Sequence, residues 1–197
     1  MQLVIEIKEY FTFTEIDQDL MTAISELHAI ELAGTLSSKR GTRAIRGLYK
    51  RLISTGGSLV VAKQKGQLVG VMSFTPNHKA MASISTLALH PLSWIRVFSS
   101  RRVAEMIKEL VDAVKVSQKL LVYENHMIYI TTVFVSESQK KTGIASLLFE
   151  RVNARSLDLS VPVVVDTRLA NISARLFYEK MGMQRIAQTR LSVIFKS

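Results

Sequence analysis

The spacing of apolar residues predicts alternating strands and helices in the first part of the chain. A strand-type run covers 3–7, and apolar residues at helical spacing then cover 18–33 and 43–53. Two β-type runs follow, on either side of Lys65 and Gly66. Their close spacing and the glycine between them predict an antiparallel hairpin.

Residues 76–122 interrupt this order, and we expect them to be a helical insertion within a single domain over 1–197. Apolar residues from Val103 to Val114 fall at helical spacing and predict an amphipathic helix. In one interpretation this helix packs on the sheet, as amphipathic helices usually do. In a second, a basic amphipathic patch makes peripheral contact with a membrane or covers a substrate pocket. The residues that motivate this patch are Trp94, Arg96, Phe98, Arg101 and Arg102.

The second half of the chain begins with an apolar, β-branched run at 128–135, which predicts a central strand. A polar turn, Gly143 and an amphipathic helix follow this strand. The short apolar run at 161–165 then predicts a buried parallel strand. A helix that opens at Asn171 and two further apolar runs complete the pattern. We therefore predict an α/β (α+β) fold around a mixed, mostly antiparallel central sheet flanked by helices.

The turn after residue 135 has the features of an anion site. A helix that starts directly after a turn leaves its first backbone N–H groups unpaired, and the helix dipole favours negative charge there. Gly143 and Ala145 keep the approach to the backbone open, while Lys140 and Lys141 add two positive charges. A solvated loop that caps a surface helix explains the same residues. The segment matches neither a Walker A loop nor the G-x-G-x-x-G dinucleotide motif.

Composition narrows the choice of function. The 197 residues include no cysteine, which excludes disulfides, cysteine nucleophiles and thiolate metal sites. The formal net charge of +10 is compatible with nucleic acid, an anionic membrane surface or acidic small ligands, and equally with a solvated basic surface. Lysine and arginine are scattered along the chain, which weakens the case for nucleic acid. The first residues do not form a signal peptide, so we expect a cytoplasmic location.

Two stretches of the second half resemble a known family. The first consists of Lys140, Lys141, Thr142, Gly143, Ile144 and Ala145. The second consists of Asn171, Ala174, Phe177, Tyr178, Gly182 and Met183. Together they resemble the pyrophosphate loop and the N-x-x-A-x-x-F-Y-x-x-x-G-F pattern of the GNAT superfamily of acyl-CoA-dependent N-acyltransferases. Lys140 departs from the Gln or Arg of the family pattern; it keeps a positive charge but lacks the planar guanidinium fork.

The resemblance implies transfer of an acetyl group from acetyl-CoA to a primary amine by direct attack in a ternary complex. It places the CoA pyrophosphate on the loop at 140–145. It places the pantetheine arm against main-chain groups of Val133, Phe134 and Val135. Asn171 fits a hydrogen bond to this arm, and a helix N-cap explains the same residue. No metal is implied.

Tyr178 is the candidate general acid, because its phenol can deliver a proton to the departing thiol. A core aromatic beside Phe177 is the alternative. The general base is open, since no residue of 128–135 is acidic. His126 is the candidate base because an unperturbed histidine titrates near neutral pH. Glu124, Glu137 and water relays are alternatives.

The acceptor is not defined by the sequence. An amino sugar or another small amine, or a peptide or protein amine, fits the reaction, whereas a polyamine is disfavoured by the positive charge of the chain. Two functions from other classes stay open: a non-catalytic CoA-binding sensor or scaffold, and a basic nucleic-acid-binding module.

Overall fold

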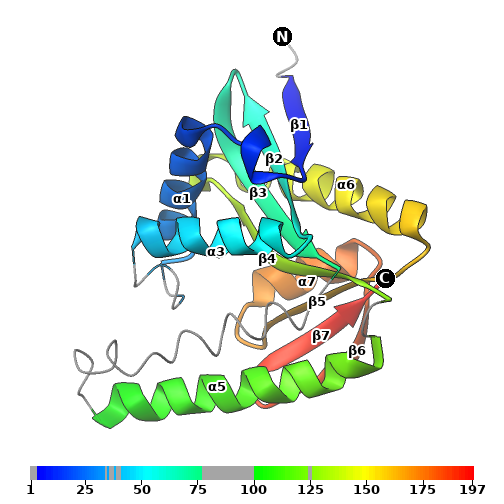
Figure 1. Cartoon of the computed structure of the whole chain (residues 1–197). Helices are drawn as coiled ribbons and strands as arrows, with labels where there is room; N and C mark the ends of the chain where they lie inside the picture. Colours follow the sequence, from blue (N-terminus) through cyan, green and yellow to red (C-terminus); the bar gives the residue numbers. More distant parts are fainter. Residues whose placement is uncertain (1–3, 34, 36–37, 39–40, 77–99, 124–125) are drawn as a thin grey trace.

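The protein folds around one mixed sheet of seven strands in the order β1-β2-β3-β4-β5-β7-β6 (Figure 1). All neighbouring strands are antiparallel except β4 and β5, which are parallel. The predicted fold class is therefore confirmed. The computed structural model describes residues 4–33, 35, 38, 41–76, 100–123 and 126–197.

The elements follow the predicted order. The strands are β1 (Ile5–Tyr10), β2 (Ser58–Gln64), β3 (Gln67–Thr75), β4 (Ile128–Val135), β5 (Val163–Arg168), β6 (Gln184–Gln188) and β7 (Ser192–Lys196). The α-helices are α1 (Gln18–Glu31), α3 (Thr42–Ser54), α5 (Ser100–Leu120), α6 (Ile144–Leu159) and α7 (Ile172–Lys180). The short 3-10 helices are η1 (Phe13–Glu15), η3 (Leu121–Tyr123) and η4 (Glu137–Gln139).

Helices cover both faces of the sheet (Figure 1). On one face, α6 and α7 pack against alternate residues of the central strands, such as Val163 and Val165. On the other face, α1 and α3 cover β2, β3 and the end of β4, while α5 covers Val164 and Ile194 of β5 and β7. The two central strands thus lie between helices on both sides.

The helix predicted around Val103 to Val114 exists as α5, and the side chains by which its described part contacts the sheet lie outside the predicted stripe. Asp112 accepts hydrogen bonds from Thr189 Oγ1 (2.8 Å), Ser192 Oγ (2.8 Å) and the Leu191 amide (3.0 Å), and Val116 and Leu120 are buried beside it. The apolar residues of the predicted stripe that are described are about half exposed: Ile107, Val111 and Val114. Polar anchoring to the β6–β7 turn therefore decides which face of α5 points inward.

The proposed membrane contact depends on residues that lie outside the described part of the chain, including Trp94, Arg96 and Phe98. Of the helices that the structure describes, none combines the length and the apolar character needed to cross a bilayer.

A β-bulge in β4 changes which side chains face each layer. Ser73 of β3 lies opposite Thr132, and Phe74 lies opposite Ile130, so Thr131 is the extra residue. Ile130 packs on the α6 side, and after the bulge Phe134 packs on the α1 side. The bulge thus shifts the alternation of β4 by one residue, which re-aims side chains locally.

Gly70 on β3 allows α6 to approach the sheet closely. A Cβ atom at this position would lie 3.0 Å from Ile144 Cγ2, 3.2 Å from Leu148 Cδ1 and 3.3 Å from Val135 Cγ2. Isoleucine and valine are β-branched and stiff at χ1, so Ile144 and Val135 cannot turn aside cheaply. Gly70 thereby helps to fix where α6 begins.

We expect Gly70→Val to lower the free energy of unfolding by about 2 kcal/mol, because overpacking a core costs about 1–3 kcal/mol. The urea midpoint of unfolding measures this. Gly47→Ala is the control: Gly47 lies in the interior of α3 with no atom within 4 Å of an added Cβ. That substitution should stabilise the helix by about 0.5–1 kcal/mol. An unchanged midpoint for Gly70→Val would contradict the close contact of α6 with β3.

Candidate functional site

The central strands β4 and β5 separate partway along their length. Their parallel pairing ends at Ile130 and Val165, although β4 continues to Val135 and β5 to Arg168. Beyond that point β4 pairs only with β3, and β5 only with β7. The β4 main chain from Thr131 onward therefore has an edge toward β5 that no strand of the described chain occupies. Val133, Phe134 and Val135, predicted to contact the pantetheine arm, belong to this edge.

The loop predicted to bind pyrophosphate leads into α6 beside this separation. Lys141 and Gly143 adopt positive φ angles of 65° and 93°, which turn the backbone into the helix. The Leu147 amide donates to the Gly143 carbonyl at 3.1 Å. In the described structure no group accepts a hydrogen bond from the amides of residues 143–146. The start of α6 thus offers several free N–H donors together with the helix dipole.

The loop is anchored from both sides. Thr142 Oγ1 donates to the Gln139 carbonyl at 2.7 Å, which closes the turn. Ile144 is buried, and Ala145 packs against the same apolar cluster, so the helix start cannot swing away from the sheet. The backbone donors are therefore held in place before any ligand binds.

Lys140 is engaged with carboxylates. Its ammonium lies 2.9 Å from Glu31 Oε2 at the end of α1 and also contacts Glu137 of η4. Glu31 accepts a second bond, from the Glu137 amide, at 2.8 Å. Hydrogen bonds to Glu137 and Glu31 raise the pKa of Lys140. The charge of Lys140 is thus largely offset, whereas Lys141 is exposed and has no ion pair within the described residues.

Asn171 and Tyr178 lie at opposite ends of α7. Asn171 Oδ1 accepts from the Ala174 amide at 3.1 Å, so Asn171 is the N-cap of this helix. Tyr178 is 2% exposed, and its ring lies 5.2 Å from that of Phe177 and 5.8 Å from that of Phe195. Burial, and secondarily the Asp166 carboxylate, raise the pKa of Tyr178. Its phenol therefore stays protonated at neutral pH.

His126, the candidate base, lies two residues before β4 and is exposed. Its amide donates to the Tyr123 carbonyl at 3.0 Å. The structure places it at the opposite end of β4 from the unpaired edge. Its role as a base stays a prediction.

A buried polar chain connects the helix layer to the bulge of β4, and sequence reasoning missed it. His28 Nδ1 lies 2.7 Å from the Tyr49 hydroxyl, which lies 3.5 Å from Thr132 Oγ1. Ser73 Oγ lies 2.6 Å from the hydroxyls of both Thr132 and Thr131. Burial lowers the pKa of His28 to about 4, so its imidazole is neutral. These contacts support the bulge beside the site.

A second missed feature is a tyrosine–aspartate pair at the point of separation. The Tyr129 hydroxyl donates to Asp166 Oδ1. Tyr129 belongs to the last paired stretch of β4, and Asp166 is the first residue of β5 beyond it. The only sequence signal is an acidic residue directly after the apolar run at 161–165.

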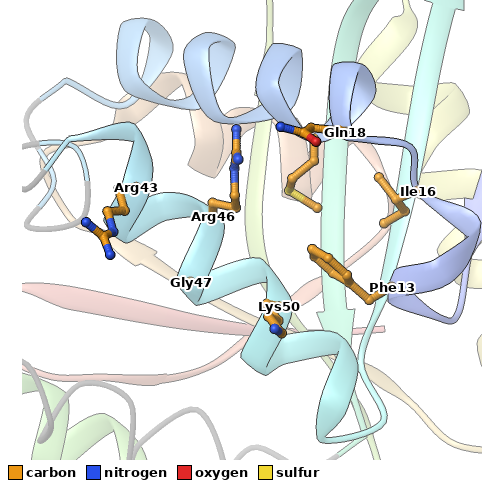
Figure 2. A pocket seen from close by; sticks show the side chains of 8 residues that line it. Phe13, Ile16, Gln18, Arg43, Arg46, Gly47 and Lys50 are labelled. Carbon is orange, nitrogen blue, oxygen red and sulfur yellow. The ribbon is translucent and has the colours of Figure 1, made fainter.

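A shallow basic hollow of about 420 Å³ lies between η1, α1 and α3 (Figure 2). Arg43, Arg46 and Lys50 line one side of it, and Phe13 and Met21 contribute apolar surface. Arg46 Nη2 donates to Thr22 Oγ1 at 2.8 Å, and the Lys50 ammonium lies 5.7 Å from the centre of the Phe13 ring. These positions differ from the stripe of α3 that faces the sheet, so the hollow is separate from the β4–β5 edge.

The sheet thus has central strands that separate beside a helix N-terminus whose first amides have no partner among the described residues. The chain belongs to the acetyltransferase (GNAT) family, whose model matches residues 22–183. No curated protein sequence matches the chain.

Solved structures share this fold at low sequence identity. An N-acetyltransferase from Staphylococcus aureus Mu50 superposes with a TM-score of 0.62 at 11% identity, over 98% of each chain. The putative acetyltransferase YncA from Salmonella typhimurium, with its cofactor acetyl-CoA, gives 0.59 at 14%, over 97% of this chain and 92% of that one. The PaiA N-acetyltransferase from Thermoplasma acidophilum, in complex with coenzyme A, gives 0.58 at 10%, over 99% of each.

Proposed function

We propose that this acetyltransferase moves an acetyl group from acetyl-CoA to a primary amine of a small molecule, peptide or protein. One observation carries the proposal: the unpaired edge of β4 ends directly beside the free amides of α6. An elongated ligand with a diphosphate at one end and amide groups along its arm fits both features. The diphosphate accepts from the amides of residues 143–146, and the arm pairs with the main chain of Val133 to Val135.

Each of these groups then has a separate role in the transfer of the acetyl group. The amine nitrogen attacks the thioester carbonyl carbon, an N–C bond forms, and the C–S bond breaks. A free main-chain N–H of β4 stabilises the developing oxyanion. Tyr178 donates its phenolic proton to the leaving sulfur, and Asn171, while capping α7, orients the arm of the substrate. The transfer is direct, because the chain has no cysteine to carry the acetyl group.

Isothermal titration with acetyl-CoA, followed by turnover on a panel of primary amines, tests the proposal. Release of the CoA thiol can be followed with a thiol-reactive dye without background, since the protein has no cysteine. We expect binding and release of thiol with at least one class of amine. Absence of binding at millimolar acetyl-CoA would overturn the proposed function. Binding without turnover would favour a CoA-binding sensor or scaffold.

The two lysines of the loop should contribute unequally to binding. We expect Lys141→Ala to weaken acetyl-CoA binding roughly five-fold, as one solvent-exposed charge contributes about 1 kcal/mol. Lys140→Ala should change the dissociation constant less than about two-fold, because Glu31 and Glu137 already offset its charge. Titration calorimetry at low salt measures both. The opposite order would show that Lys140 leaves its carboxylates to contact the phosphate.

A further inference from the structure

The Tyr129–Asp166 pair lies where the pairing of β4 with β5 ends. Its side chains are on the face of the sheet that carries α1, α3 and α5. Tyr129 packs with Val164 and Ile194 on this face. In the register of β5 and β7, Asp166 lies opposite Ile194, so both point to the same side. Tyr178 and the apolar cluster of α6 lie on the opposite face. The separation thus has a phenol on one face and a phenol–carboxylate pair on the other.

The surroundings of Asp166 favour a carboxyl group that exchanges protons. No basic side chain of the described residues forms an ion pair with it. β4 supplies the Tyr129 hydroxyl, α5 supplies Asp112, α7 supplies Tyr178, and β7 supplies the apolar Ile194. Burial raises the pKa of Asp166, and Asp112 adds to this, while the hydrogen bond from Tyr129 opposes it. The group is therefore more basic than an ordinary aspartate.

We propose that Asp166, oriented by Tyr129, is the general base that takes the proton of the acceptor ammonium. The inference rests on the proposed function and supplies the base that the central strand lacks. Asp166 has the required position, because in the proposed complex the arm of acetyl-CoA follows the β4 edge and its thioester lies near the point where β4 and β5 part. It also has the required charge, since a carboxylate draws an ammonium group into a chain whose formal net charge is +10.

The proton balance closes with these groups. The ammonium gives one proton to Asp166, and the neutral amine attacks the thioester. Tyr178 protonates the thiolate, the second nitrogen proton leaves as the amide forms and restores the Tyr178 phenol through solvent, and Asp166 releases the first proton to solvent, so one proton is released for each turnover. Protonation of Asp166 also removes the negative charge that helps to raise the pKa of Tyr178. Uptake of the first proton thereby makes Tyr178 a better acid for the second step.

The first test compares Asp166→Asn with wild type by thiol release, using the best amine of the panel. We expect turnover at pH 7 to fall about 100-fold or more, as general base catalysis contributes about 10²–10⁴-fold. The deficit should shrink as pH approaches the pKa of the amine, because free amine then needs no base. A deficit that is constant with pH would indicate distortion and overturn the proposal. Asp158→Asn removes an exposed carboxylate of α6 and should leave turnover unchanged.

The second test uses Tyr129→Phe, which keeps the ring and removes the hydrogen bond to Asp166. The hydroxyl stabilises the charged carboxylate, so its loss raises the pKa of Asp166 further. The acidic limb of the pH profile of kcat/KM should therefore move to higher pH. This result does not depend on whether Asp166→Asn folds. An acidic limb that stays in place would overturn the proposal, and so would full activity of Asp166→Asn alongside inactivity of His126→Ala.

Loss of the base assignment and loss of the proposed function give different experimental results. If wild type turns over an amine and Asp166→Asn does so equally well, only the assignment of the base is lost. If wild type binds acetyl-CoA but acetylates no amine, the proposed function is lost and the base assignment with it.

Discussion

Gly143→Val should weaken acetyl-CoA binding by about 100-fold or more while leaving the fold intact. Gly143 has a φ angle of 93°, which a β-branched residue adopts only with severe strain. An added Cβ would meet no atom within 4 Å, so the effect comes from the backbone and not from packing. The loop must turn differently into α6, and the amides of residues 143–146 then no longer converge on one diphosphate. Titration calorimetry with acetyl-CoA measures the loss.

Gly56→Val is the matched control. Gly56 follows α3, has a φ angle of 85°, and likewise has no atom within 4 Å of an added Cβ. Both substitutions should lower the free energy of unfolding by similar amounts, about 1–3 kcal/mol for a strained backbone position. Only Gly143→Val should affect affinity for acetyl-CoA. Equal affinity in both variants would mean that the start of α6 does not hold the ligand.

The sequence predicted the central strand with the observed bounds, 128–135, because a β-branched apolar run is bounded by polar turns on both sides. It also predicted the turn into α6, since a glycine before an amphipathic helix is a local feature. The cap of α1 is local in the same way: Asp17 Oδ1 accepts from the Leu20 amide at 2.6 Å. Each of these depends on a few consecutive residues.

Features that depend on distant residues were not predictable. The bulge at Thr131 is visible only from the register of β4 on β3. The inward face of α5 is decided by Asp112, whose partners lie near the C-terminus. The partner of Lys140, Glu31, is more than a hundred residues away in sequence. Likewise, Tyr129 and Asp166 meet only because β4 and β5 are parallel neighbours.

Tyr178→Phe should reduce turnover about 100-fold and leave affinity for acetyl-CoA within about two-fold of wild type, because a general acid contributes about 10²–10⁴-fold to rate but little to binding. The substitution removes one hydroxyl and keeps the ring that packs on Phe177 and Phe195. Burial, and then the Asp166 carboxylate, raise the pKa of this phenol, so it is protonated when acetyl-CoA binds; loss of the Asp166 charge during the reaction makes it a better acid. Single-turnover release of the CoA thiol measures the chemical step directly.

Tyr10→Phe separates this role from the general effect of losing a buried hydroxyl. Tyr10 of β1 is also buried, and burial raises its pKa as well, but it packs in the cluster under α1 and α3. Its loss should leave turnover unchanged. If Tyr178→Phe retains wild-type turnover, Tyr178 serves only to pack α7 on the sheet, and the thiolate takes its proton from solvent. If Tyr178→Phe loses turnover while Tyr10→Phe does not, the hydroxyl beside the β4–β5 separation acts on the leaving sulfur.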